Sequence, residues 1–225
     1  MRTTFVNTLT ELARKDERIF LITADMGFSV FEGFREEFPD RFLNTGIAEQ
    51  NTIGIAAGLA LSNKIVYAYS IIPFITMRCF EQIRLDLAYN NTNVKLVGVG
   101  AGFTYGPMGS SHHAIEDIAI MRTIPNMTIV APADAEEMKR LMYQTLDYEG
   151  PIYIRIAKGY DPIVTDPDLP FEIGKAIIYG SGKDVLLITT GITLGIAKEV
   201  STKLQEKNIT STILHMHTIK PFDKD

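Results

Sequence analysis

Short, largely apolar runs alternate along the chain with segments whose apolar residues recur every three or four positions. The apolar runs are typical of strands buried on both faces, and they fall at 19–24, 41–44, 65–69, 94–99, 128–130 and 152–156. The intervening segments predict helices at 2–15, 31–38, 48–62, 74–89, 116–121 and 134–147, the last capped by Asp134. This alternation indicates a doubly wound α/β fold with a mostly parallel sheet covered on both faces.

A change of composition divides the chain. Residues 157–170 are rich in Gly, Asp and Pro, with prolines at 162, 167 and 170, and predict a linker. Beyond it, predicted strands at 185–189 and 211–216 flank a predicted helix at 193–207. Because these repeats are too few to cover both faces of a sheet, we expect a first domain at 1–156 and, at 171–225, the incomplete start of a second, smaller α/β domain.

Composition and charge exclude several classes of function. The 225 residues are 46% hydrophobic, which is typical of a globular protein, and the 22 basic residues are dispersed among 27 acidic ones. Without a basic stripe, the chain is not expected to bind nucleic acid, and no apolar run is long enough to span a membrane. The single cysteine, Cys79, allows no intrachain disulfide, and the first residues include no signal-peptide apolar region. We therefore expect a cytoplasmic protein that acts on a small molecule.

The densest candidate chemistry lies at 44–60, NTGIAEQNTIGIAAGLA. Glu49 falls in the first turn of a predicted helix, shortly after a predicted strand. A carboxylate at this point is favoured by the helix dipole, so one interpretation is a simple N-terminal cap. The other is a ligand-binding residue, because an α/β sheet binds its ligand where strands give way to helices. Small residues from Gly54 to Leu59 would also let a second copy of the chain approach this helix closely.

Five motifs in register resemble one known family. GIAEQN at 46–51, followed by AAGLAL, resembles the pyrimidine-binding domain of thiamine-diphosphate enzymes of the transketolase group, which includes deoxyxylulose-phosphate synthase and E1 β subunits. The other motifs are ITADM at 22–26, GSSHHAIEDIAIMRTIPNM at 109–127, APADAEEM at 131–138 and GPIYIR at 150–155. The resemblance covers residues 1–156 and implies the family's fold, its thiamine diphosphate cofactor and its transferase chemistry.

The resemblance implies two catalytic residues. Glu49 matches the carboxyl that hydrogen-bonds N1′ of the cofactor's aminopyrimidine ring and thereby promotes loss of the C2 proton of the thiazolium. His112 matches the histidine that points at the reactive carbon and assists substrate proton transfers, a task that suits an imidazole. His215 and His217 lack a third metal ligand at suitable spacing and are interpreted as structural.

The same resemblance implies further cofactor-binding residues. Asp25 and Met26 match the end of the family's first strand. Phe74 and Ile75 lie where relatives carry a phenylalanine that stacks on the pyrimidine, and which of the two faces the ring is left open. Arg78 matches an arginine of the synthase branch, although its position also suits a surface residue of a helix.

The residues that would contact the substrate match the family only in part. Arg155 matches an arginine that contacts the substrate phosphate, and His112 also faces the substrate. Met108, however, stands where transketolases and the synthase carry an aspartate, and Gly100 or Ala101 stands where they carry a basic residue. Because a phosphate would lose charge-assisted hydrogen bonds in such a pocket, these departures argue against the usual phosphorylated ketose.

One part of the family's machinery is missing from the sequence. The family binds diphosphate and a divalent cation through a GDG motif, and this chain contains no GDG and no implied metal ligand. The resemblance therefore implies a split enzyme, in which an N-terminal partner subunit binds the diphosphate and Mg²⁺. We expect a homodimer of this chain within a heterotetramer that transfers a two-carbon ketol unit between sugars. Two alternatives stay open: an E1 β-type or synthase-type subunit that acts on a 2-oxoacid, and a catalytically silent binding or assembly subunit.

Overall fold

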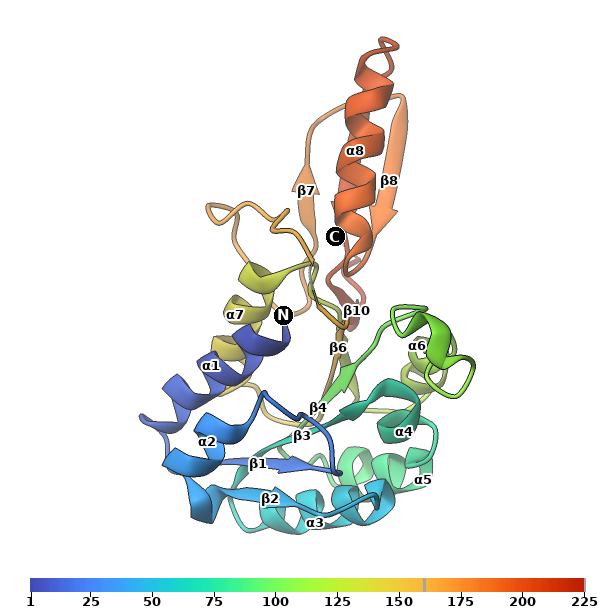
Figure 1. Ribbon diagram of the computed structural model, residues 1–225. Coiled ribbons are helices and arrows are strands. Elements are labelled where there is room, and N and C mark those ends of the chain that lie inside the picture. Colours follow the sequence, from blue (N-terminus) through green and yellow to red (C-terminus); the bar gives the residue numbers. More distant parts are fainter. Residues whose placement is uncertain (160, 225) are drawn as a thin grey trace.

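The computed structural model describes residues 1–159 and 161–224, which form a large unit and a smaller one (Figure 1). The large unit is built on a seven-stranded sheet of order β10-β5-β6-β4-β3-β1-β2. Its strands are β1 (Ile19–Thr23), β2 (Phe42–Asn44), β3 (Ile65–Ile71), β4 (Val94–Val99), β5 (Thr128–Val130), β6 (Ile152–Ile156) and β10 (Thr218–Lys220). Neighbouring strands are parallel except β10, which runs antiparallel to β5. This is the mostly parallel α/β sheet that the sequence predicts.

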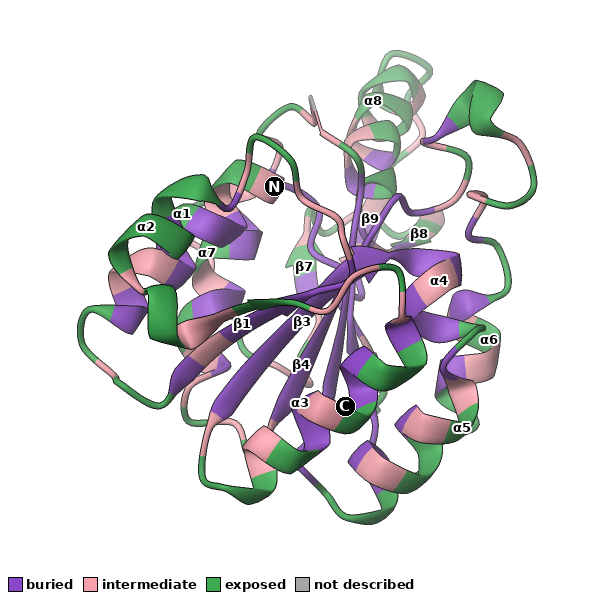
Figure 2. Cartoon of the chain, turned by 60° about the horizontal axis from the view of Figure 1, so that its bottom comes forward, coloured by how far each residue is buried: buried purple, intermediate pink, exposed green. Residues whose placement is uncertain are grey.

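Helices cover both faces of this sheet (Figure 1). One face carries α1 (Arg2–Ala13), α2 (Glu32–Glu37) and α7 (Ala135–Gln144), and the other carries α3 (Glu49–Leu61), α4 (Ile72–Thr76), α5 (Phe80–Gln82), the π-helical η2 (Ile83–Tyr89) and α6 (Asp117–Arg122). Because side chains alternate along a strand, Leu21 of β1 packs with the α1 layer and Ile22 with the α3 layer. Figure 2 shows buried central strands between helices whose outer faces are exposed. The 3₁₀ turns η1 (Pro39–Arg41) and η3 (Gly106–Met108) lie in connections.

The smaller unit follows the predicted linker. It consists of β7 (Ile177–Tyr179), β8 (Val185–Thr189), α8 (Thr193–Gln205) and β9 (Ser211–His215), with a three-stranded sheet of order β7-β9-β8. Leu194 and Ala197 of α8 pack on Ile213 of β9, so the helix covers one face of this sheet. Two predicted segments include residues outside the described part of the chain, namely Tyr160 in the predicted linker and Asp225 at the end of the predicted second domain.

The strand β10 returns the chain to the large sheet after the smaller unit. Thr218 pairs with Val130 of β5, so that β10 forms the edge of the sheet. Next to this pair, the amide of Ala131 donates a 2.7 Å hydrogen bond to the carbonyl of His217. The predicted second domain at 171–225 thus contributes a strand to the sheet of the first, which the pattern of apolar residues does not indicate, and the boundaries at 1–156 and 171–225 stay a prediction.

The helix predicted at 74–89 is wrong as a continuous element. The segment instead forms α4, a break at 77–79, the single turn of α5 and the π-helical η2. The side chains of Cys79, Ile83 and Leu87 are all fully buried in the core on this face of the sheet. Arg78, in the break, reaches the start of α3 instead of continuing a helix. Such π-helical segments are rare and often mark functional sites.

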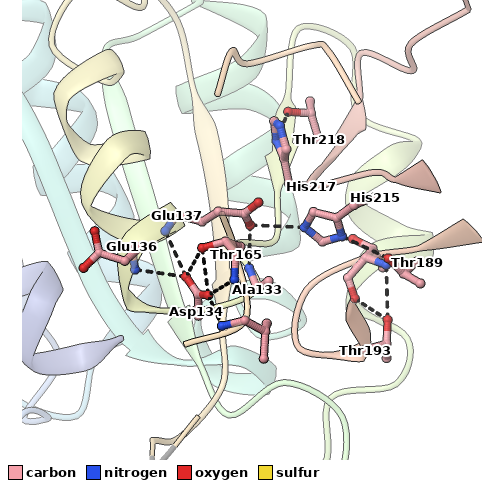
Figure 3. Close-up of polar contacts among 12 residues, drawn as sticks. Ala133, Asp134, Glu136, Glu137, Thr165, Thr189, Thr193, His215, His217 and Thr218 are labelled. Atoms are coloured by element: carbon pink, nitrogen blue, oxygen red, sulfur yellow. Dashed lines mark hydrogen bonds and ion pairs between the residues drawn. The ribbon is translucent and has the colours of Figure 1, made fainter. Parts of the chain in front are cut away.

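A buried polar junction joins the two units (Figure 3). The Asp134 carboxylate caps α7 by accepting hydrogen bonds from the backbone amides of Glu136 and Glu137, which confirms the predicted N-cap. Its other oxygen accepts hydrogen bonds of 2.7 Å from the amides of Val164 and Thr165 in the predicted linker. One fully buried side chain therefore fixes both the start of α7 and the path of the linker.

A second buried carboxylate completes the junction (Figure 3). Oε2 of Glu137 accepts a 2.7 Å hydrogen bond from the Ala133 amide and lies 3.1 Å from Nε2 of His215. The other ring nitrogen of His215 lies 3.0 Å from Oγ1 of Thr189 in β8. His215 and His217 are both fully buried, which fits their interpretation as structural residues.

Candidate active site

Glu49 lies at the carboxyl ends of the parallel strands. β2 ends at Asn44, Gly46 turns the chain with a φ of 72°, and α3 begins at Glu49. Glycine suits this turn because it adopts positive φ without strain. The turn is tied to β1 by the amide of Thr45, which donates to the carbonyl of Thr23 at 2.9 Å. A strand-to-helix switch of this kind is where an α/β sheet binds its ligand.

The Glu49 carboxylate is buried and paired with a cation. Its side chain is 2% exposed, and Oε2 accepts a 2.5 Å hydrogen bond from Nη1 of Arg78. The Arg78 guanidinium lies over the ring of Phe74, 4.7 Å from the ring centroid. Within the described part of the chain, Oε1 of Glu49 has no hydrogen-bond partner, so this oxygen is left for a ligand.

The structure separates the two candidate stacking residues. Phe74 is partly exposed, and its ring makes a T-shaped contact with the ring of His112, with the centroids 5.1 Å apart. Ile75 is 1% exposed and packs in the hydrophobic core between α3 and the sheet. Phe74 is therefore the one of the pair whose ring lies beside both Arg78 and His112.

His112 reaches this cluster from a glycine-rich loop. Its Nδ1 lies 2.9 Å from Oγ of Ser111, and its ring centroid lies 5.3 Å from that of Tyr105. The loop is closed by a pair of backbone hydrogen bonds between Gly102 and Ala114. Sequence reasoning missed Tyr105, because its contact with His112 depends on how this loop folds back on itself.

Arg155, the predicted substrate anchor, is bonded within the protein. Its Nε donates to Oδ2 of Asp117 at 2.7 Å, and its Nη2 donates to the carbonyl of Ala114 at 3.0 Å. Asp117 also accepts a 2.6 Å hydrogen bond from the hydroxyl of Tyr153, whose pKa is raised by burial and by the charge of Asp117. With its side chain 16% exposed, Arg155 ties the histidine loop to β6 and also lines a cavity of about 450 Å³.

Asp25 and Met26 lie at the end of β1, beside the turn that precedes Glu49. The Asp25 amide donates to Oδ1 of Asn44 at 2.9 Å, and the same oxygen accepts a 3.0 Å hydrogen bond from the amide of Gly46. Both predicted residues line a small cavity of about 60 Å³. Asp25 is therefore linked to the turn before Glu49 through Asn44.

Two kinds of feature are absent from residues 1–159 and 161–224. These residues include no group of three or more His, Cys, Asp or Glu side chains that could hold a metal ion. They also include no helix that is long and apolar enough to cross a membrane. The candidate site is thus made of one buried carboxylate, aromatic rings, a histidine and cations.

Two family models match the chain. The model described as "Transketolase, pyrimidine binding domain" matches residues 1–160, and the model described as "Transketolase, C-terminal domain" matches residues 174–225. The first match includes Glu49, the histidine loop and Arg155. The second includes the whole of the smaller unit and β10.

Curated relatives and a solved structure are similar over almost the whole chain. The chain is 41% identical over 224 residues to one of the subunits of the apulose-4-phosphate transketolase of Phocaeicola vulgatus, a match that covers 99% of this chain and 72% of that protein. It is 37% identical over 226 residues to the 6-deoxy-6-sulfo-D-fructose transketolase subunit SqwH of a Clostridium species, a match that covers 100% of this chain and 70% of that protein. A solved structure described as a split-gene transketolase, inactive beta4 tetramer, matches with a TM-score of 0.89 and 37% identity, over 99% of this chain and 72% of that one. The chain therefore belongs to the transketolase family, which implies thiamine diphosphate as its cofactor.

Proposed function

We propose that this chain is the pyrimidine-binding subunit of a split transketolase and that, with a partner subunit, it transfers a two-carbon ketol unit between sugars. The observation that carries the proposal is the buried Glu49 carboxylate at a strand-to-helix switch, with Phe74 and His112 close to its partner Arg78. The comparisons support it, because both curated relatives are named as transketolase subunits.

The residues present fit the aminopyrimidine half of thiamine diphosphate. A pyrimidine ring needs an apolar surface and a carboxyl group that can hold a proton at its N1′. Phe74 offers the surface, and Oε1 of Glu49, which has no partner among the described residues, offers the carboxyl oxygen. Arg78 holds the other oxygen and so fixes the orientation of the carboxylate. Asp25 and Met26 would border the cofactor from the end of the neighbouring strand.

The chemistry divides between the cofactor and the side chains. When bound, the cofactor supplies a nucleophilic thiazolium carbon. Glu49 would hold the proton at N1′, a role that needs burial because water would compete for the same hydrogen bond. His112 would take or give the substrate proton, since its Nδ1 is engaged by Ser111 and its Nε2 is left for substrate. The rings of Phe74 and Tyr105, which flank His112, would exclude water from the reacting atoms.

The proposed substrate is a ketose that ends in an anionic group. The two curated relatives are named for a phosphorylated sugar and a sulfonated sugar. These names weigh against the expectation, drawn from Met108 and Gly100, that a phosphorylated ketose is not the substrate. Arg155 lines a cavity of about 450 Å³ while Asp117 and the Ala114 carbonyl bind its Nε and Nη2, so it stays a candidate anchor for such a group.

The proposed assembly pairs two copies of this chain with two copies of an N-terminal subunit that binds diphosphate and Mg²⁺. An added Cβ at Gly54 or Gly58 of α3 would meet nothing within 4 Å, so this stripe of small residues is uncovered. Ile47 and Leu61, before and at the end of the same helix, are 78% and 70% exposed. Pairing of two copies through α3 would cover these apolar side chains.

Calorimetry and a substrate panel test this proposal. Thiamine diphosphate with Mg²⁺ should bind weakly to the chain alone and tightly after a GDG-bearing partner is added, because the diphosphate needs a cation and oxygen ligands. Tight, Mg²⁺-dependent binding by the chain alone would contradict the split site. The reconstituted pair should then transfer ketol units from ketoses. Decarboxylation of 2-oxoacids without ketol transfer would support the E1 β or synthase alternative, and full activity with Glu49→Gln would support a silent subunit.

A further inference from the structure

Two residues of β6, Tyr153 and Arg155, bind one carboxylate at the end of the histidine loop. This loop, residues 100–116, leads from β4 to α6, and Asp117 is the first residue of α6. Oδ2 of Asp117 accepts hydrogen bonds of 2.6 Å from the Tyr153 hydroxyl and 2.7 Å from Nε of Arg155. Because alternate residues of a strand lie on the same face, both donors reach the carboxylate from one side of the sheet. The end of the loop is thus fastened to an interior strand.

The Tyr153 ring reaches this carboxylate because position 98 has no side chain. Gly98 lies on the neighbouring strand β4, opposite Arg155. A Cβ added there would lie 2.9 Å from Cε2 of Tyr153 and 2.8 Å from Cγ1 of Ile72. Both distances are too short for a contact between two carbon atoms, so a larger residue at 98 would displace the ring. The fully buried phenol is therefore held in one place by close packing.

The Tyr153 hydroxyl donates its proton to Asp117 and does not give it up. An ionised carboxylate can only accept hydrogen bonds. Burial and the charge of Asp117 raise the pKa of Tyr153 well above its ordinary value, so the phenol stays protonated. A hydrogen bond to an ionised group is stronger than one between neutral groups. Loss of this hydroxyl would leave the buried carboxylate with the guanidinium of Arg155 as its side-chain donor.

The same contacts fix the part of the loop that carries His112. Nη2 of Arg155 donates to the carbonyl of Ala114 at 3.0 Å. The backbone of Ala114 pairs with that of Gly102 on the other side of the loop. His112 lies two residues before Ala114, and its ring contacts that of Phe74. The position of the imidazole therefore depends on contacts that begin in β6.

We propose that Tyr153 is a positioning residue, which holds His112 in place for the substrate proton transfer by way of Asp117 and the histidine loop. This inference rests on the proposed function and adds to it a residue that the motifs do not indicate. Tyr153 is fully buried, so it touches neither substrate nor cofactor and acts through the imidazole. Gly98 belongs to the same arrangement, because it makes room for the phenol.

Tyr153→Phe, which keeps the ring and removes the hydroxyl, tests this inference in the reconstituted complex. Tyr67→Phe is the matched control: Tyr67 is also fully buried, and its hydroxyl lies 2.7 Å from Oγ1 of Thr145, but it packs on the opposite face of the sheet from Tyr153. Both variants should lower the midpoint of thermal unfolding. We expect only Tyr153→Phe to lower kcat, roughly tenfold or more, because small misplacements of a reacting group slow the reaction strongly. KM should change little.

Three further measurements separate positioning from general destabilisation. In the His112→Ala background, Tyr153→Phe should not lower the residual kcat further, because its effect requires the imidazole. Proton exchange at C2 of bound thiamine diphosphate should keep the wild-type rate, because this step is assigned to Glu49. In the chain alone, backbone amides of residues 100–116 should exchange with deuterated water faster in Tyr153→Phe than in the wild type, and Tyr67→Phe should leave them unchanged.

Several outcomes would overturn the inference. An unchanged kcat in Tyr153→Phe, or an equal fall in Tyr67→Phe, would show that the hydroxyl only stabilises the fold. A further fall in the His112→Ala background, or slower C2 exchange, would show that the hydroxyl acts on something other than the imidazole. If the wild-type complex transfers no ketol unit, the proposed function fails; amide exchange in the chain alone then still tests the hold on the loop, and unchanged exchange there would overturn it.

Discussion

Removing the Asp134 carboxylate should release the linker from the start of α7 and destabilise the protein. Asp134→Ala takes away the N-cap of α7, which costs about 1 kcal/mol. It also takes the acceptor from the amides of Val164 and Thr165, each at 2.7 Å, in a fully buried position. A buried amide left without its acceptor costs about 1–3 kcal/mol. Together these losses predict a free energy of unfolding lower by about 4 kcal/mol, since the two amides share one carboxylate and their costs overlap.

Urea denaturation followed by circular dichroism measures this loss, and limited proteolysis near residues 161–170 reports on release of the linker. The matched control is Glu136→Gln, because Glu136 lies in the same turn but contributes only its backbone amide to the junction (Figure 3). We expect the control to stay within about 0.5 kcal/mol of the wild type. A loss below about 1 kcal/mol in Asp134→Ala, no more than the cap alone, or an equal loss in the control, would refute the reasoning.

Acid should remove the stabilisation by the Asp134 carboxylate in the wild-type protein. Burial by itself would raise the pKa of Asp134, but hydrogen bonds from the backbone of Glu137, Val164 and Thr165 outweigh burial and lower that pKa. A carboxylate whose pKa is lower in the folded state than in the unfolded state stabilises the fold above its unfolded pKa. Its contribution should therefore disappear as the pH falls through the folded-state pKa, and Asp134→Ala should lack this part of the acid transition.

Three further predictions concern buried titratable groups. Burial lowers the pKa of His217 from 6.5 to about 4, so at intermediate pH the unfolded chain binds a proton that the folded chain does not. The free energy of unfolding should therefore drop by about 3 kcal/mol as the pH falls from about 6.5 to 4. His217→Leu should flatten that drop. Burial lowers the pKa of Lys95 from 10.5 to about 7, so above about pH 7 the unfolded chain holds a proton that the folded chain has lost. The free energy of unfolding should therefore rise by about 1.4 kcal/mol per pH unit from about pH 7 to 9. Lys95→Met should abolish this slope. Asp117→Asn leaves the Arg155 guanidinium without its carboxylate, and thermal unfolding should show a loss of about 3 kcal/mol; a loss below about 1 kcal/mol would contradict the structural role given to the pair.

The fold was predictable wherever a strand is apolar on both faces. Residues of β1, β3, β4 and β6 face a helical layer on either side, so each run in the sequence is apolar throughout, and the alternation with helices follows. β10 was not predictable, because its three residues, Thr218 to Lys220, are too few to show an alternation of apolar and polar positions. They also pair with a strand far away in the sequence. The break at 77–79 was missed because local propensity favours one helix there, and tertiary contacts of Arg78 and Cys79 decide otherwise.

The candidate site was predictable where a motif fixes a residue to an element. Glu49 lies at the helix start that its motif requires, and Phe74 contacts both His112 and Arg78, the partner of Glu49. The ion pair of Glu49 with Arg78 was not predictable, because it depends on the irregular segment after α4. Tyr105 was missed for a similar reason: nothing in the sequence shows that Gly100 makes room for its ring beside His112.

Proton exchange at C2 of bound thiamine diphosphate tests the central claim, that Glu49 activates the cofactor. The reconstituted complex is transferred to deuterated water, and the exchange rate is compared between wild type, Glu49→Gln and Gln50→Ala, which changes the exposed neighbour. Because Gln keeps the shape of Glu but cannot hold the proton in the same way, we expect folding and cofactor binding to persist while exchange slows by about 100-fold or more. Gln50→Ala should exchange at the wild-type rate. Wild-type exchange in Glu49→Gln, with the cofactor bound, would contradict the account.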